Sequence, residues 1–138
     1  LDLDHGPSGV IGDRAFHRDA RVATLLAKSV MHGLLLAGLL ACGKHFPGHG
    51  DVSTDSHLGL AAVPGDAARL DRIELLPFAT AVQAGVDSVM TGHLSVPGLG
   101  EDPRVPATLS HRILTGVLRE RLGFGGLLVT DALDMGGV

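Results

Sequence analysis

The stretch from Lys44 to His57 holds the densest group of reactive side chains in this sequence. It combines imidazoles and carboxylates, which exchange protons or bind metal ions, at His45, His49, Asp51, Asp55 and His57. Pro47, Gly48 and Gly50 interrupt the stretch, and these residue types disfavour a regular helix or a central strand. The sequence therefore predicts a loop that carries either an acid–base site or a metal site.

An apolar run over residues 39–42 ends directly before this loop. Such a run predicts a buried strand, so Lys44 and His45 should lie at its carboxyl end, where α/β folds place their ligands. Cys42 falls inside the run and is the only cysteine in the sequence. We therefore interpret Cys42 as a small buried hydrophobe rather than as part of a disulfide.

Apolar runs and helical patterns alternate along the rest of the chain. The runs predict strands over residues 1–5, 39–42, 86–91 and 126–130. The helical patterns predict helices over about 20–37, 71–84 and 111–122. Asp19 and Ser110 are suited to N-caps, glycines follow each helix, and Pro77 marks a first turn or a kink.

Each predicted strand ends in, or is followed closely by, a charged or imidazole side chain, namely Asp4 and His5, Lys44 and His45, His93, and Asp131. A (β/α)8 barrel brings the carboxyl ends of all its strands to one rim, whereas a doubly wound sheet gathers ligands at one switch point. We therefore expect an α/β fold that is a partial (β/α)8 TIM barrel of about four consecutive β/α units. Because a whole barrel takes about 250 residues, residues 1–138 should be a fragment of a single barrel domain.

Composition excludes two classes of partner. The net charge is −4 and no basic cluster is present, which argues against nucleic-acid binding. The longest apolar stretch, residues 30–43, is interrupted by His32 and glycines and is shorter than the roughly 20 residues of a membrane span. The sequence does not fix the compartment, and we favour the cytoplasm over secretion.

Two motifs resemble the family-3 glycoside hydrolases, in particular the bacterial β-N-acetylhexosaminidases. The first is Lys-His-Phe-Pro-Gly-His-Gly at 44–50 followed by Asp-Ser-His at 55–57, and the second runs from Gly-Phe-x-Gly at 123–126 to Thr-Asp-x-Leu-x-Met at 130–135. Shorter pieces at 1–4, 11–16, 76–78 and 89–93 match in the same order. The resemblance implies a retaining glycosidase without a cofactor, which removes terminal β-linked N-acetylglucosamine from muropeptide- or chitin-type saccharides, as in peptidoglycan recycling.

The resemblance also implies roles for individual residues. Asp131 would be the nucleophile, His57 the acid/base and Asp55 the residue that orients His57. The residues implied to contact the sugar are Arg14, Lys44, His45, Met90 and His93. The chemistry agrees, because a retaining mechanism needs one ionised carboxylate and one group that first donates and then accepts a proton, and an imidazole titrates near neutral pH.

Three alternatives remain open from the sequence. The ligand types among His45, His49, Asp51, Asp55 and His57 also suit a metal-dependent hydrolase, although their spacing matches no compact metal motif. A β-N-acetylglucosaminide phosphorylase of the same family is the second, because a histidine base repels an incoming phosphate less than a carboxylate would. The third is a carbohydrate-binding protein without catalysis.

Overall fold

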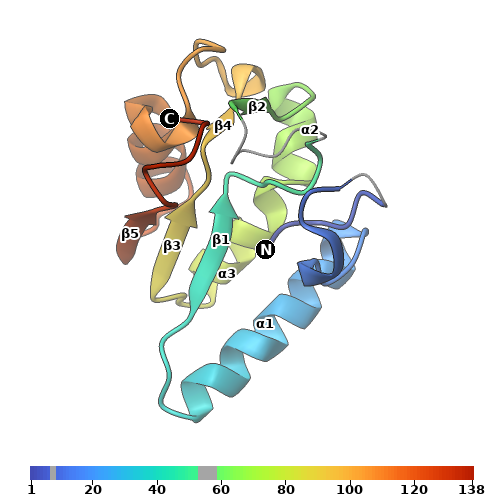
Figure 1. Ribbon diagram of the computed structural model, residues 1–138. Helices are drawn as coiled ribbons and strands as arrows, with labels where there is room; N and C mark the ends of the chain where they lie inside the picture. Colours follow the sequence, from blue (N-terminus) through green and yellow to red (C-terminus); the bar gives the residue numbers. More distant parts are fainter. Residues whose placement is uncertain (7–8, 53–58) are drawn as a thin grey trace.

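The computed structural model describes residues 1–6, 9–52 and 59–138. Its central sheet has three parallel strands in the order β1–β3–β5 (Figure 1). Their bounds are β1 Cys42–Phe46, β3 Ser88–Thr91 and β5 Leu127–Thr130. A shorter parallel pair, β2 Ala61–Ala62 and β4 Leu94–Ser95, lies toward the end of the molecule to which β1 and β3 point. The sequence does not predict this pair, because two residues are too few to show an alternating pattern.

Helices connect the strands of the central sheet. They are α1 Ala20–Leu36, α2 Ala67–Arg72, α3 Leu75–Gln83 and the wide, π-type helix η4 Arg112–Arg121, with 3-10 turns η1 Gly12–Arg14, η2 Pro97–Leu99 and η3 Ala107–Leu109. Helix α1 packs against α3, and α3 packs against β1 (Figure 1). Parallel strands joined through helices confirm the expected α/β architecture. None of the helices in the described ranges combines the length and the apolar character needed to cross a membrane.

The predicted caps explain where the long helices begin. Asp19 accepts hydrogen bonds from the backbone N–H groups of Arg21 and Val22, so α1 begins where the sequence predicts. Ser110 Oγ accepts from the N–H of Ile113 at 3.1 Å at the start of η4. The single helix predicted over 71–84 is instead two helices, and Pro77 lies in the first turn of α3, where no N–H is required.

The first strand of the predicted pattern is not a strand. Residues 1–6 run beside β1 without regular pairing, and the amino group of Leu1 donates to the carbonyl of Lys44. The carboxylate of Asp2 accepts the N–H groups of His45 and His49 in place of a ladder of backbone hydrogen bonds. A side chain therefore replaces strand pairing along this edge of the sheet.

The second strand begins later than predicted. Leu39 and Leu40 are 55% and 80% exposed and precede β1, whereas Lys44, His45 and Phe46 belong to it. The expectation of a loop beginning at Lys44 is therefore wrong for these three residues, because the residues that prevent strand pairing begin only at Pro47. The expectation that Cys42 is buried is also wrong, since its side chain is exposed at the start of this edge strand.

Candidate active site

The carboxylate of Asp131 lies directly after β5, at the carboxyl end of the sheet. Its backbone N–H donates to the carbonyl of Thr91 at 3.0 Å, which ties the end of β5 to the end of β3. One carboxylate oxygen accepts the N–H of Ala132 at 2.9 Å, and the side chain is 24% exposed. Backbone contacts thus hold Asp131 in place, and among the described residues its second oxygen faces Nε2 of His45.

His45 connects Asp131 to a second carboxylate, Asp2. The Nε2 atom of His45 lies 3.8 Å from Asp131 Oδ2, and its Nδ1 atom lies 2.7 Å from Asp2 Oδ2. An ionised Asp2 carboxylate can only accept hydrogen bonds. Nδ1 of His45 therefore carries the ring proton and donates a hydrogen bond to Asp2. The distance of 3.8 Å exceeds that of a hydrogen bond, so within the described part of the chain Nε2 lies beside Asp131 without bonding to it.

Asp2 is almost completely buried yet remains a strong acceptor. Burial alone would raise the pKa of this carboxyl, but the hydrogen bond from the ring of His45, the positive charge of the Leu1 amino group and the hydrogen bond from the backbone N–H of His49 hold its pKa below the ordinary value. The described contacts therefore fix both the tautomer and the orientation of His45. Sequence reasoning missed Asp2, because it placed Asp2 inside the predicted strand and assigned the chemistry to Asp4 and His5 at the strand end.

The Pro-Gly-His-Gly turn after β1 packs too tightly for side chains at its glycines. A Cβ at Gly48 would lie 2.7 Å from the Cβ of Glu74, and Gly48 also has a φ of +129°. A Cβ at Gly50 would lie 2.2 Å from the carbonyl oxygen of Leu3. The glycines of the motif therefore let this turn approach both α3 and the N-terminal segment that carries Asp2.

His93 lies at the same end of the sheet but has no exposed surface. Its Nδ1 atom lies 2.8 Å from Thr108 Oγ1, and its Nε2 atom lies 2.8 Å from the carbonyl oxygen of Ala132. Both ring nitrogens are thus engaged by protein atoms. The predicted contact of His93 with a substrate stays a prediction, and in this structure the ring faces the backbone next to Asp131.

The other predicted substrate-binding residues are spread more widely. Lys44 is exposed on β1, and Met90 is half-buried on β3. Arg14 is exposed in η1, where its guanidinium donates to the carbonyls of Ile11 and Val10 at 3.2 and 3.3 Å. Asp55 and His57 lie outside the described residues. Of the predicted site residues that the structure describes, His45 and Asp131 have side chains within ion-pair distance of each other.

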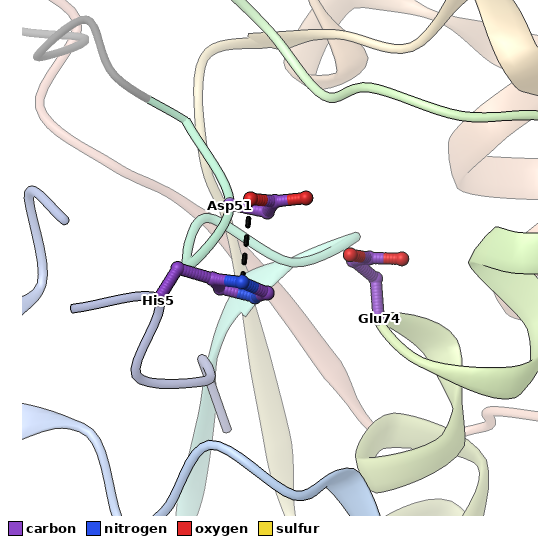
Figure 2. Close-up of side chains that lie close together, drawn as sticks. All are labelled: His5, Asp51 and Glu74. Atoms are coloured by element: carbon purple, nitrogen blue, oxygen red, sulfur yellow. Dashed lines mark ion pairs between the residues drawn. The ribbon is translucent and has the colours of Figure 1, made fainter.

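A separate cluster combines His5, Asp51 and Glu74, whose ligand-type atoms all lie within 4.8 Å of one another. Figure 2 shows His5 and Asp51 facing each other, with Nδ1 and Oδ1 3.3 Å apart, and Glu74 reaching toward them from the start of α3. The guanidinium of Arg69 contacts both carboxylates and lies 3.1 Å from Glu74 Oε1. Burial raises the pKa of Glu74, and Arg69 opposes that shift. An arginine cation therefore already balances the charge that would attract a metal ion.

The metal alternative named five candidate ligands, of which the structure describes three, and it does not bring these three together as a group. Among them, Asp51 belongs to the cluster with His5 and Glu74. The ring of His45 and the backbone N–H of His49 instead contact Asp2. The described part of the chain therefore gives the predicted metal site no structural support.

Comparison with known proteins identifies the family. The profile of the glycosyl hydrolase family 3 N terminal domain matches residues 1–138. The chain belongs to this family. A beta-hexosaminidase of Bordetella pertussis is 45% identical over 137 residues, which is 99% of this chain and 38% of that protein. The chain thus spans about two fifths of the length of such relatives.

Solved family-3 structures share the fold. A β-N-acetylglucosaminidase from Paenibacillus sp. str. FPU-7 superposes with a TM-score of 0.94 at 43% identity over 99% of this chain and 26% of its own. NagZ from Neisseria gonorrhoeae, in complex with N-trifluoroacetyl-D-glucosamine, gives a TM-score of 0.87 at 39% identity over 96% of this chain and 38% of its own. The structure of NagZ from Neisseria gonorrhoeae in complex with zinc ion gives a TM-score of 0.85 at 36% identity, over 99% of this chain and 38% of its own. These matches confirm the prediction of a partial TIM barrel of the family-3 type.

Proposed function

We propose that residues 1–138 are part of one longer catalytic barrel domain, and that the full-length protein is a retaining β-N-acetylhexosaminidase. The observation that carries this proposal is the position of Asp131 at the carboxyl end of β5, beside a His45 ring whose orientation is fixed by Asp2. Relatives named beta-hexosaminidase and family-3 β-N-acetylglucosaminidases support the same chemistry. The substrate class is a small saccharide with a terminal β-linked N-acetylglucosamine.

In the first step of the proposed reaction, a carboxylate oxygen of Asp131 attacks the anomeric carbon and forms a glycosyl ester. The glycosidic bond breaks, its electron pair goes to the leaving oxygen, and His57 protonates that oxygen. In the second step water attacks the anomeric carbon, His57 takes a proton from the water, and the ester bond breaks to restore Asp131. Two inversions return a β-configured product.

His45 and Lys44 would hold the sugar during both steps. The Nε2 atom of His45 points to the space beside Asp131, so it can accept a hydrogen bond from a sugar hydroxyl while Nδ1 stays bonded to Asp2. Lys44 is exposed on the same strand and offers three further donors. Arg14 would join them after it releases the carbonyls of Val10 and Ile11.

The anomeric configuration of the product tests the proposed function. The full-length protein should release β-N-acetylglucosamine first from an aryl N-acetyl-β-glucosaminide, as seen by proton NMR before mutarotation. An α-configured first product would contradict the retaining mechanism.

Treatment of the full-length protein with EDTA should leave the hydrolysis rate unchanged. A loss of activity that added zinc restores would favour the metal-dependent alternative.

Leaving groups test the role of His57. Proton donation matters most when the leaving group is a poor anion, so His57→Ala should reduce kcat/KM far more for alkyl or disaccharide substrates than for activated aryl ones. A loss of equal size for all leaving groups would contradict His57 as the acid.

The phosphorylase alternative predicts that inorganic phosphate accelerates turnover and yields the sugar 1-phosphate.

A further inference from the structure

Thr91, the last residue of β3, and His93, two residues later, both bond to the backbone next to the Asp131 side chain. The carbonyl of Thr91 accepts the N–H of Asp131 at 3.0 Å. Two residues further on, the ring of His93 contacts the carbonyl of Ala132 at 2.8 Å through Nε2. The short backbone segment that carries the carboxylate is therefore attached to β3 before and after the carboxylate.

The contact with Ala132 fixes the state of the His93 ring. A carbonyl oxygen only accepts, so Nε2 must carry a proton. The Nδ1 atom then accepts from the hydroxyl of Thr108 at 2.8 Å if the ring is neutral. A ring without exposed surface favours this arrangement, because a neutral imidazole satisfies both contacts without burying an uncompensated charge.

Thr108 is itself held by the end of β3. Its Oγ1 atom lies 3.2 Å from Thr91 Oγ1 and 3.2 Å from the carbonyl oxygen of Gly92, both longer than its contact with the ring. The Gly92 carbonyl can only accept, so it and Nδ1 compete for the single hydroxyl proton of Thr108. The shorter contact to Nδ1 favours donation to the ring, and the Thr91 hydroxyl can then donate to Thr108. A continuous series of contacts thus runs from Thr91 through Thr108 and His93 to the Ala132 carbonyl.

We propose that His93 is a positioning residue for the nucleophile rather than a substrate ligand, and that the Thr108 hydroxyl, by donating to Nδ1, holds the ring in the orientation in which Nε2 binds the peptide after Asp131. This inference rests on the proposed function, which makes Asp131 the nucleophile. Displacement of a reacting atom by about 1 Å can reduce a rate by about 100-fold. Loss of the Thr108 hydroxyl should therefore slow the attack by Asp131 without weakening sugar binding.

The test compares Thr108→Val, Thr108→Ser and Thr115→Val in the full-length protein. Thr108→Val should lower kcat/KM by about 10- to 100-fold, by the same factor for activated and poor leaving groups, because the nucleophile and not the proton donor is displaced. The dissociation constant for N-acetylglucosamine should stay within about twofold of the wild type, a range well under the tenfold that corresponds to 1.4 kcal/mol. Thr108→Ser restores the hydroxyl and should restore the rate, and Thr115→Val, which makes the same change outside these contacts, should leave it unaltered.

The outcomes separate this inference from the proposed function. Covalent labelling of wild-type Asp131 by a slow fluorinated substrate is scored first, and absence of that label refutes the proposed function. If the wild type is labelled and Thr108→Val is labelled at the same rate, the positioning role is refuted, as it is if the loss appears only in sugar binding. Should Thr108→Val fail to fold, nitrogen-15 NMR of the His93 ring in the wild type tests the proposal. A proton on Nε2 alone supports it, and a proton on Nδ1 overturns it.

Discussion

The carboxylate of Asp2 shows how one buried side chain can organise a site. It accepts from the ring and backbone of His45 and from the backbone of His49, so three donors converge on its two oxygens. These donors favour the ionised form and, together with the positive charge of the Leu1 amino group, lower the pKa of Asp2 despite burial. Asp2 therefore stabilises the folded protein and orients His45 at the same time.

Asp2→Asn should destabilise the full-length protein at pH 7 by about 1 to 3 kcal/mol, because its amide cannot accept at both positions. The pKa of Asp2 is lower in the folded than in the unfolded protein, so its stabilising effect is complete above the ordinary value of 3.8 and is lost as the pH falls through the folded value. The difference in unfolding free energy between wild type and variant should therefore shrink below about pH 4. Urea unfolding at pH 7, 5 and 3 measures it.

Asp19→Asn is the matched control for this prediction. It makes the same change at an exposed N-cap, where asparagine caps a helix about as well as aspartate. Its effect on stability should be small at pH 7. A difference between wild type and Asp2→Asn that stayed constant from pH 7 to pH 3 would contradict the role assigned to Asp2.

At the scale of residues, the sequence predicts chemistry where side chains follow strands and fall in a motif. Lys44, His45 and Asp131 are found in this way, and the structure places His45 within ion-pair distance of Asp131. The sequence cannot show that His93 is enclosed, since the contacts that enclose it come from Thr108 and Ala132, far along the chain. The roles of Asp55 and His57 stay predictions, because both lie outside the described residues.

At the scale of elements, the Gly-Phe-x-Gly turn determines where β5 begins. Arg119 donates to the carbonyls of Phe124 and Gly126 at 3.0 and 2.7 Å and lies over the Phe124 ring. A Cβ at Gly126 would lie 2.4 Å from the carbonyl oxygen of Asp87, directly before β3. The motif therefore sets the spacing between β3 and β5, and with it the position of Asp131.

Gly126→Ala should destabilise the full-length protein by about 1 to 3 kcal/mol, because the backbone of Asp87 must move to admit the methyl group. Activity should fall as well, since β5 carries Asp131. Gly125→Ala is the matched control, because nothing lies within 4 Å of a Cβ placed there. Chemical unfolding of the two variants measures the difference, and equal stability would show that β3 and β5 do not constrain Gly126.

The elements that the sequence predicts best are those with local signals. Helix α1 has an N-cap at Asp19 and a glycine after its end, and β5 has a glycine turn before it. Pro77 lies in the first turn of α3, one of the two positions predicted for it, whereas the sequence does not predict a separate helix α2 that begins at Ala67. The wide turn of η4 has no local signal in the sequence that we recognise.

At the scale of the whole molecule, the described residues leave much apolar surface uncovered. Most of the exposed large hydrophobic side chains lie on α1, on the segment after it and around β5: Val22, Leu25, Leu26, Val30, Leu35, Leu36, Leu39, Leu40, Leu127 and Leu133. Strands β1 and β5 also form the two edges of the central sheet. Further barrel strands and helices would cover these surfaces, as expected for a chain that spans about two fifths of its relatives.

Residues 1–138 expressed alone should therefore not melt cooperatively and should not hydrolyse an aryl N-acetyl-β-glucosaminide. Open sheet edges and exposed apolar faces favour association over a unique fold. Calorimetry and binding of a hydrophobic dye check this prediction, with the full-length protein as the control. A sharp two-state melt together with turnover would show that the segment is self-sufficient.

The partial barrel is predictable from sequence because reactive residues lie at the ends of successive predicted strands. A barrel accounts for this pattern, since it brings the carboxyl ends of all its strands to one rim. The number of strands is less predictable. Residues 1–5 have the composition of a strand, but Asp2 bonds to β1 through its side chain instead of its backbone. The long-range contacts that decide such cases leave no periodic signal in the chain.

The identity of the nucleophile is the central claim, and covalent trapping tests it most directly. A slow 2-deoxy-2-fluoro or 5-fluoro sugar analogue should accumulate the glycosyl ester in the full-length protein, and mass spectrometry of its peptides should find one added sugar on the peptide that contains Asp131. Asp131→Asn should abolish the label and leave the fold intact. Attachment to any other carboxylate, or turnover of Asp131→Asn at the wild-type rate, would contradict the account.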